Sequence, residues 1–153
     1  MIKIMFVCTG NICRSAMAEY LLKQKLIDKG MAQKVEVSSC GTYAEANESS
    51  TYESITTMKK VYGIDMQMHR ATRLRDSKIY EMDLILCMTN SHKNTLLMTC
   101  PDLDKKIFLL KEYVGLEGDV DDPYGYGLDV YNKCAEEINN CLDLLVEKEF
   151  GGV

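Results

Sequence analysis

The sequence of 153 residues contains no tryptophan, only two prolines and only three phenylalanines. It has no internal repeats and no low-complexity tract. No apolar stretch approaches the roughly 20 residues that a membrane-spanning helix needs, and no signal peptide precedes the first apolar run. We therefore expect a cytoplasmic protein without a membrane span.

The seven cysteines follow none of the patterns that bind a metal or build a disulfide framework. Their number is odd, no Cys-x-x-Cys pair occurs, and no zinc-like quartet is present. Most of them are expected to be small buried hydrophobes in a reducing compartment. The sequence therefore predicts neither a metal nor a cofactor.

The chain carries 18 Lys and Arg against 23 Asp and Glu, a formal net charge of -5 at pH 7. Because phosphate backbones require a basic face, this balance argues against nucleic acid as a general partner. Hydrophobic residues make up 46% of the chain, which is ordinary for a globular protein. Since no domain boundary is evident, residues 1–153 are expected to form a single domain.

Apolar runs of strand length alternate with segments of helical periodicity along the chain. Strands are expected at residues 2–7, 34–39, 83–88 and 106–110. Helices are expected from a cap at Ser15 to Gly30, at 51–62, from a cap at Asn90 or Ser91 to 98, and at 128–150, with a long loop at 111–126. The alternation predicts an α/β fold, a doubly wound domain in which helices flank a four-stranded parallel sheet.

The first strand leads directly into a loop that carries a thiol, a glycine, an arginine and the start of a helix. Cys8 follows the strand, and Arg14 and Ser15 come at the end of the loop. Ligands of such sheets bind beyond the carboxyl ends of strands, where loop amides, a helix N-terminus and a guanidinium would hold an oxyanion. The same positive groups favour the thiolate of Cys8. The pattern predicts phosphoryl transfer to cysteine.

Two other interpretations of this loop fit its sequence less well. A structural cysteine beside a surface arginine would need neither the buried strand before the loop nor the helix after it. A nucleotide-binding loop would need Gly-x4-Gly-Lys-Ser/Thr or Gly-x-Gly-x-x-Gly, and neither pattern occurs. The loop therefore favours catalysis.

Cleavage of a phosphate ester also needs a general acid, and the long loop at 111–126 offers three aspartates. Asp119, Asp121 and Asp122 lie so close together that spacing alone does not choose among them. Pro123 fixes one backbone angle beside them and would help to aim a carboxylate.

Residues 7–19 read Val-Cys-Thr-Gly-Asn-Ile-Cys-Arg-Ser-Ala-Met-Ala-Glu and resemble the signature of the low-molecular-weight protein tyrosine phosphatases. Residues 121–124, Asp-Asp-Pro-Tyr, are similar to the second motif of that family, and the resemblance spans nearly the whole chain. It implies metal-independent hydrolysis of phosphotyrosine through a phosphocysteine intermediate on Cys8. Arg14 would stabilise the transition state, and Asp122 would be the general acid and base, with Asp121 as the fallback.

The resemblance also assigns roles to residues around the catalytic ones. The phosphate would be bound by Thr9, Gly10, Asn11, Ile12, Cys13, Arg14 and Ser15. Asn11, Ser15 and His69 would hold the loop in shape, and asparagine suits a left-handed backbone conformation. His92, in contrast, is expected at the surface.

Three residues resemble positions that line the substrate pocket, where a phenyl ring would pack: Ile12, Tyr43 and Tyr124. Family members that act on phosphoarginine carry threonine at the position of Ile12, so the resemblance favours phosphotyrosine. Cys13 resembles a partner that forms a reversible disulfide with the nucleophile, and a second buried thiol is the alternative. The implied partners are phosphotyrosine protein substrates, a tyrosine kinase, and inorganic phosphate or other oxyanions in the loop.

Two functions from other classes fit the sequence less well. Arsenate reduction on the same fold needs two further cysteines closely after the third strand. Cys87 ends that strand, but Cys100 lies too far along the chain. A catalytically silent phosphate-binding module would not need Cys8, Arg14 and Asp122 together. A phosphotyrosine phosphatase remains the leading hypothesis.

Overall fold

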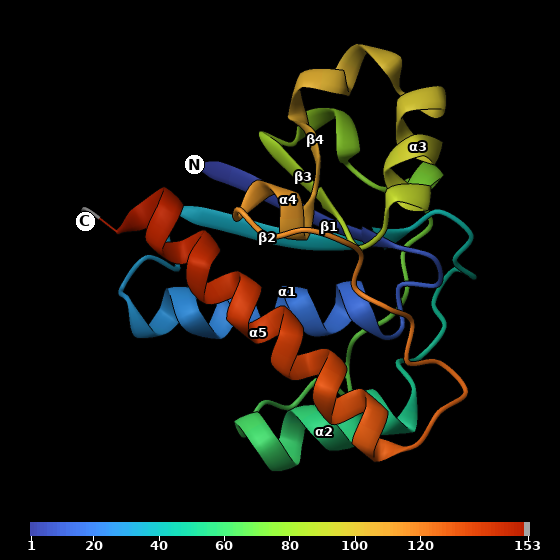
Figure 1. The fold of residues 1–153 in the computed structure, drawn as a ribbon, viewed down its shortest axis with the longest axis vertical. Helices are drawn as coiled ribbons and strands as arrows, with labels where there is room; N and C mark the ends of the chain where they lie inside the picture. The colour runs from blue at the N-terminus through green and yellow to red at the C-terminus, as the bar shows by residue number, and fades with distance from the viewer. Residues whose placement is uncertain (152–153) are drawn as a thin grey trace.

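The structure, a computed structural model, describes residues 1–151, which contain four strands and five α-helices (Figure 1). The strands are β1 (Ile2–Cys8), β2 (Val35–Gly41), β3 (Leu84–Cys87) and β4 (Ile107–Leu109). The α-helices are α1 (Arg14–Asp28), α2 (Tyr52–Tyr62), α3 (Asn90–Thr99), α4 (Leu110–Tyr113) and α5 (Leu128–Phe150). Three short 3-10 helices lie at Leu74–Asp76, Ile79–Glu81 and Pro101–Lys106.

The strands form one parallel sheet in the order β2-β1-β3-β4, which confirms the fold class expected from the sequence. On one side of β1, Cys8 lies opposite Gly41 of β2; on the other side, Val7 lies opposite Cys87 of β3. The chain leaves β1 toward β2 and later leaves β3 toward β4, so its winding direction reverses between β1 and β3. Doubly wound folds bind ligands at such a reversal, beyond the carboxyl ends of the strands.

β1 is buried on both faces, as its nearly continuous apolar sequence predicts. Ile4 and Phe6 pack into a core with α1, α2 and α5, whereas Met5 and Val7 pack into a second core on the side of α3. Figure 1 shows this division, with α1, α2 and α5 on one side of the sheet and α3 on the other. The sheet therefore holds the end of β1 rigidly between two helical layers.

Several helix ends lie where the sequence places them. Gly30 and Gly63 adopt positive φ angles of 74° and 68° just beyond α1 and α2, a conformation that ends helices and that glycine adopts without strain. Thr51 caps α2, since its hydroxyl accepts a hydrogen bond from the Ser54 amide at 3.2 Å. The last helix, α5, has the bounds predicted from its apolar periodicity.

Three local predictions were wrong. Ser15 does not cap α1, which begins at Arg14 after Cys13; the Ser15 hydroxyl bonds to Cys8 instead. The cap of α3 is Thr89, because its hydroxyl accepts from the amide three residues later. The predicted loop at 111–126 starts later, since α4 occupies the residues up to Tyr113.

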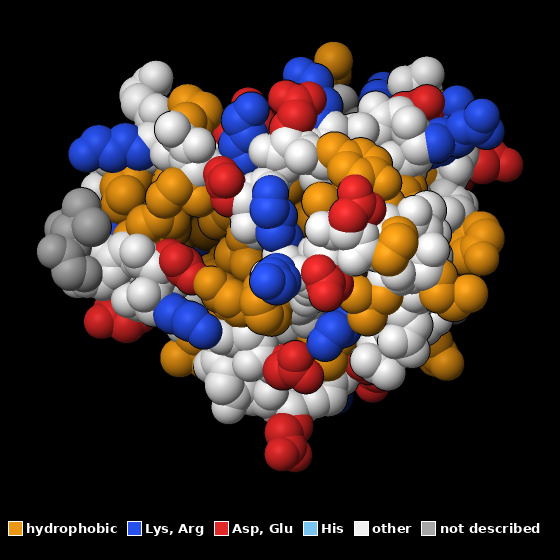
Figure 2. Space-filling model, turned by 90° about the horizontal axis from the view of Figure 1, so that it is seen from above, with side chains coloured by type: hydrophobic (Ala, Val, Ile, Leu, Met, Phe, Trp, Pro, Cys, Tyr) orange, Lys and Arg blue, Asp and Glu red, His pale blue; other side chains and the backbone are white. Residues whose placement is uncertain are grey.

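The surface mixes charges of both signs. Figure 2 shows acidic and basic side chains interspersed with apolar ones over one face of the molecule, without a continuous basic field on that face. Among the helices of residues 1–151, none combines the length and the apolar character that crossing a membrane would require.

Candidate active site

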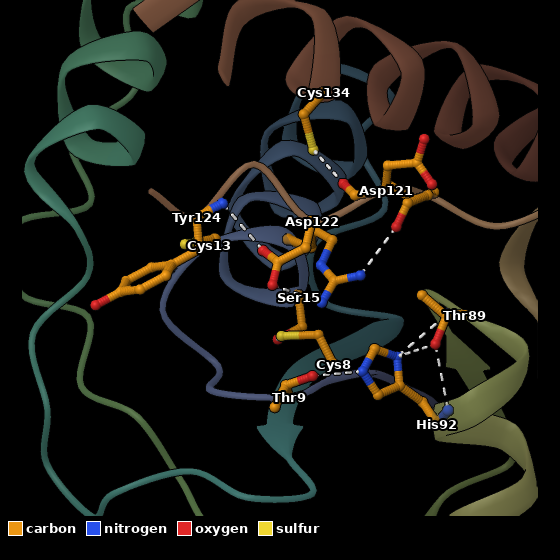
Figure 3. A network of polar contacts seen from close by, with 12 residues as sticks. Cys8, Thr9, Cys13, Ser15, Thr89, His92, Asp121, Asp122, Tyr124 and Cys134 are labelled. Carbon is orange, nitrogen blue, oxygen red and sulfur yellow. Dashed lines mark hydrogen bonds and ion pairs between the residues drawn. The ribbon is translucent and has the colours of Figure 1, made fainter. Parts of the chain in front are cut away.

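A pocket of about 240 Å³ opens at the carboxyl end of β1, at the reversal in the sheet. Its lining comes from the loop after β1, from the loop after β2 and from the segment before α5: Cys8, Thr9, Gly10, Ile12, Cys13, Arg14, Glu48, Asp122 and Tyr124. The fold thus brings together residues more than a hundred positions apart in the chain. Figure 3 shows several of them around Cys8.

Cys8 lines this pocket and is 2% exposed. Its sulfur accepts a hydrogen bond from the Asn11 amide at 3.3 Å and lies 2.8 Å from the Ser15 hydroxyl. Ser15 Oγ already accepts a hydrogen bond from the Asn11 side-chain amide at 2.8 Å, so its own hydrogen is free to be donated to the sulfur. Two donors therefore converge on Cys8, an arrangement that stabilises a thiolate.

Asn11 holds the turn of the loop. Its φ of 56° is left-handed, a conformation that asparagine tolerates better than most residues. Its fully buried side chain donates to Ser15 and to Ser39, and accepts from the Thr72 amide at 3.0 Å. Nε2 of His69 lies 2.9 Å from the Asn11 carbonyl oxygen. The structure therefore brings Asn11, Ser15 and His69, the three residues expected to hold the loop, into one hydrogen-bonded network.

The end of β2 fixes the other side of the loop. The amides of Thr42 and Tyr43 donate to the carbonyls of Cys8 and Thr9 at 2.9 and 3.0 Å. Gly41 allows this close approach, since a Cβ there would lie 2.3 Å from the Thr9 carbonyl oxygen. These hydrogen bonds hold the start of the loop against the residues that follow β2.

The Arg14 guanidinium lies against the pocket and is 4% exposed. Its Nη1 donates to the Val120 carbonyl at 2.9 Å, and its Nη2 lies 3.6 Å from Oδ2 of Asp122. The carbonyl fixes the plane of the guanidinium, which suits a group that must bind two phosphoryl oxygens in a set direction.

Of the three aspartates in the long loop, only Asp122 lines the pocket. Its carboxylate is half exposed, and Oδ1 accepts a hydrogen bond from the Tyr124 amide at 3.1 Å. Asp119 instead accepts from the Asn90 amide at the start of α3. The backbone carbonyl of Asp121 is 3.8 Å from the Cys134 thiol (Figure 3). Of the three aspartates, the structure therefore brings only Asp122 to the pocket.

The pocket walls differ in part from those expected. Ile12 and Tyr124 line the pocket, as predicted, whereas Tyr43 is 77% exposed and borders a separate hollow beside α3. The backbone of Tyr43 is used to hold the Thr9 carbonyl, which leaves its side chain on the outer side of the loop. Glu48, which the sequence did not single out, lines the pocket in its place.

Cys13 lines the same pocket as Cys8 and is buried. Its sulfur lies 3.2 Å from the Tyr131 hydroxyl and 3.7 Å from Thr51 Oγ1. Burial raises the pKa of the Cys13 thiol to about 11, against the lowering effect of these hydrogen bonds. Cys13 is therefore a neutral thiol near pH 7.

The prediction for His92 was wrong, since this residue is 5% exposed and belongs to the site. Its Nε2 lies 2.8 Å from Thr9 Oγ1, and its Nδ1 lies 3.1 Å from the Thr89 amide nitrogen (Figure 3). Burial, followed by the charge of Arg14, lowers the pKa of His92 to about 4. The spacing Thr89-x-x-His92 at the start of a helix was the only local signal, because it has the form of a capping box.

Comparisons with family models, curated proteins and solved structures all point to the same family. A family model described as low molecular weight phosphotyrosine protein phosphatase matches residues 3–150. A solved structure of a low molecular weight protein tyrosine phosphatase from T. tengcongensis is similar with a TM-score of 0.92 and 44% identity, covering 97% of this chain and 99% of the other.

Two curated relatives carry different substrate names. A protein-arginine-phosphatase of Geobacillus stearothermophilus is 37% identical over 148 residues, covering 95% of each chain. A low molecular weight protein-tyrosine-phosphatase of Staphylococcus haemolyticus is 34% identical over 136 residues, covering 89% of this chain and 91% of the relative.

Proposed function

Because the chain belongs to the low molecular weight phosphotyrosine protein phosphatase family, we propose that it hydrolyses phosphotyrosine in proteins through a phosphocysteine intermediate. The observation that carries this proposal is the meeting of Cys8, Arg14 and Asp122 around one pocket. These residues supply a nucleophile, a clamp for phosphoryl oxygens and a carboxyl group that can exchange protons.

In the first step, the Cys8 sulfur attacks phosphorus and the bond from phosphorus to the phenolic oxygen breaks. The Ser15 hydroxyl and the Asn11 amide stabilise the negative charge of this sulfur. Charge on the equatorial oxygens is met by the Arg14 guanidinium and by amides of the loop. Burial of these donors strengthens each interaction, because the local dielectric is low.

The leaving phenolate needs a proton, which Asp122 in its protonated form would supply. Asp122 is the aspartate that lines the pocket, and its half-exposed carboxyl group stands across from Arg14. In the second step, the resulting carboxylate removes a proton from water as the water attacks the phosphocysteine. Inorganic phosphate then leaves, and both Cys8 and Asp122 return to their starting states. No step of this scheme uses a metal ion or a cofactor.

The pocket walls favour an aromatic substrate group. Ile12 is branched and apolar, Tyr124 is aromatic, and both residues line the pocket, which suits contact with a flat phenyl group. Phosphotyrosine proteins are accordingly the proposed substrates, and a tyrosine kinase is the implied source of these substrates.

Phosphoarginine is the second candidate substrate, for two reasons. Two curated relatives, one of Geobacillus stearothermophilus and one of Bacillus subtilis, are named protein-arginine-phosphatases. In addition, Glu48 lines the pocket and could attract a guanidinium group. Ile12 opposes this candidate because its side chain offers the guanidinium no hydrogen-bond acceptor.

Three further assignments accompany the proposal. We infer a cytoplasmic location, because Cys8 acts as a free thiol and a reducing compartment keeps it so. We infer that Cys13 protects Cys8 through a reversible disulfide, since both line the same pocket. We also infer that residues 1–153 form a single phosphatase domain, since the family model spans most of them.

The test compares release of phosphate from peptides of one sequence that carry phosphotyrosine, phosphoserine or phosphoarginine. We expect the highest kcat/KM for phosphotyrosine. Cys8→Ser should abolish turnover while retaining phosphate binding. Full activity of Cys8→Ser would refute the mechanism, and a preference for phosphoarginine would replace the proposed substrate with the second candidate.

A further inference from the structure

Thr9 and His92 form a hydrogen bond between the phosphate loop and helix α3. Thr9 Oγ1 and His92 Nε2 are 2.8 Å apart, although the residues are 83 positions apart in the chain. The pairing of β1 with β3 produces this contact, because Val7 lies opposite Cys87 just before the two loops begin. Figure 3 shows the ring of His92 directed toward Thr9, beside Cys8.

The neighbours of His92 determine which ring nitrogen carries the proton. The Thr89 amide can only donate, and it lies 3.1 Å from Nδ1. Nδ1 is therefore the acceptor, and in the neutral ring the hydrogen is on Nε2. The low pKa of His92, which is about 4 because of burial and the nearby Arg14, keeps the ring in this neutral form near pH 7.

This tautomer fixes the role of the Thr9 hydroxyl. Nε2–H donates to Thr9 Oγ1, so the hydroxyl hydrogen of Thr9 must point elsewhere. Among residues 1–151, Thr9 Oγ1 has no other hydrogen-bond partner, and the exposed side chain belongs to a residue that lines the pocket. The hydroxyl hydrogen is therefore available to a bound molecule.

We propose that the Thr9 hydroxyl, oriented by His92, donates a hydrogen bond to an oxygen of the phosphoryl group bound in the loop. The proposal rests on the phosphatase function proposed above, and it adds a side-chain donor to the loop amides and Arg14. His92 does not line the pocket, so it is a positioning residue that acts through Thr9. As a neutral donor, His92 can hold Thr9 without placing a second cation against Arg14.

A purely structural role for His92 is the competing explanation, because the same ring completes the cap of α3. The two roles use different nitrogens: Nδ1 serves the cap and Nε2 serves Thr9. Variants can therefore separate them. Thr89→Val removes the capping hydroxyl, which also lies 3.0 Å from Nδ1, but it leaves the backbone amide that donates to Nδ1 and the contact of Nε2 with Thr9, so it is the matched control for helix capping.

The experiment measures inhibition by inorganic phosphate, together with kcat and KM for p-nitrophenyl phosphate. Thr9→Val, which removes the hydroxyl and keeps the shape, should weaken phosphate binding about tenfold, the scale of one hydrogen bond to a charged group. Thr9→Ser should restore wild-type affinity. His92→Phe should weaken binding to a similar extent, and Thr89→Val should not change it.

The double variant Thr9→Val/His92→Phe distinguishes the two explanations. If His92 acts through Thr9, the double variant binds phosphate as Thr9→Val does. If His92 is only structural, the two losses add, and the proposal is overturned. Unchanged affinity in Thr9→Val, an exposed substitution expected to leave folding intact, would also overturn it. Wild-type protein that binds phosphate but hydrolyses nothing would refute the proposed function instead.

Discussion

Oδ2 of Asp122 lies 3.6 Å from Nη2 of Arg14, and the two groups differ sharply in their surroundings. The arginine side chain is 4% exposed and fixed by a backbone carbonyl, whereas the aspartate side chain is 52% exposed. The clamp for phosphoryl oxygens is therefore rigid, and the proposed acid stands at the mouth of the pocket, where a leaving group would pass.

Asp122→Asn should lower kcat for p-nitrophenyl phosphate and for phosphotyrosine peptides by about 10²–10⁴-fold, the usual contribution of a general acid and base. The amide keeps the shape of the carboxyl group but cannot supply the proton. Asp121→Asn is the control, because Asp121 does not line the pocket. A larger loss in Asp121→Asn than in Asp122→Asn would overturn the assignment.

Ile12→Thr should shift specificity from phosphotyrosine toward phosphoarginine. The substitution removes an apolar wall for the phenyl ring and adds a hydroxyl that can accept from a guanidinium. We expect the ratio of the two kcat/KM values to change by at least about tenfold, because the loss of one apolar contact changes transition-state binding by about 1–3 kcal/mol. Adding Glu48→Gln to Ile12→Thr should reduce the gain in kcat/KM for phosphoarginine. If the ratio of the two kcat/KM values stays at the wild-type level in both variants, Ile12 does not determine substrate specificity.

Gly41→Ala should damage both activity and stability, because the new Cβ would lie 2.3 Å from the Thr9 carbonyl oxygen and 3.0 Å from the Asn11 amide nitrogen. The loop would have to move, at a cost of about 1–3 kcal/mol in unfolding free energy. Gly127→Ala is the matched control, since nothing lies within 4 Å of its added Cβ. Urea unfolding and phosphate affinity measure the two effects, and a fully active Gly41→Ala would show that the close approach is dispensable.

Much of the fold could be predicted because its signals are local. The buried run of β1 and the apolar stripe of α5 occur within short windows of sequence, and both elements form where expected. Helix boundaries were predicted wrongly where a side chain can form a hydrogen bond either with the helix or with another part of the fold. Ser15 has the chemistry of a helix cap, but in the fold its hydroxyl bonds to Cys8, which lies before the helix.

Sequence alone groups those candidate site residues that lie within one motif. Cys8 and Arg14 are six positions apart, so sequence alone places them in one loop. Asp122 could be chosen over its neighbours only through the family resemblance, and geometry later separated the three. His92 and Glu48 were missed because their place at the site depends on long-range packing: β3 beside β1 for the first, and the loop after β2 for the second.

Cys13→Ser should make oxidative inactivation harder to reverse. After limited hydrogen peroxide, a sulfenic acid on Cys8 can condense with the Cys13 thiol, forming a disulfide and releasing water, and dithiothreitol then restores both thiols. In Cys13→Ser, Cys8 proceeds to acids that dithiothreitol does not reduce. Because the pKa of Cys13 is about 11 and its thiolate is the attacking form, the disulfide should form faster at higher pH. Cys141→Ser, in the core of α5, is the control; equal recovery in all three proteins would refute the protective role.

The low pKa of His92 also predicts a pH dependence of stability. An unfolded histidine has a pKa near 6.5, whereas that of His92 in the folded protein is about 4. Between these values the unfolded chain binds a proton that the folded chain does not, so the unfolding free energy falls as pH drops from about 6.5 toward 4. Above this window, His92 is neutral in both states and has no such effect.

The unfolding free energy of wild type should therefore fall more between pH 7 and pH 5 than that of His92→Phe, which lacks the titrating ring. Groups common to both proteins, including the neighbouring Asp119 and Asp122, should contribute similar losses, so the difference between the two proteins isolates His92. Urea unfolding at both pH values measures it. Equal losses would mean that His92 is charged in the folded protein near pH 5, and Nδ1 could then no longer accept from the Thr89 amide.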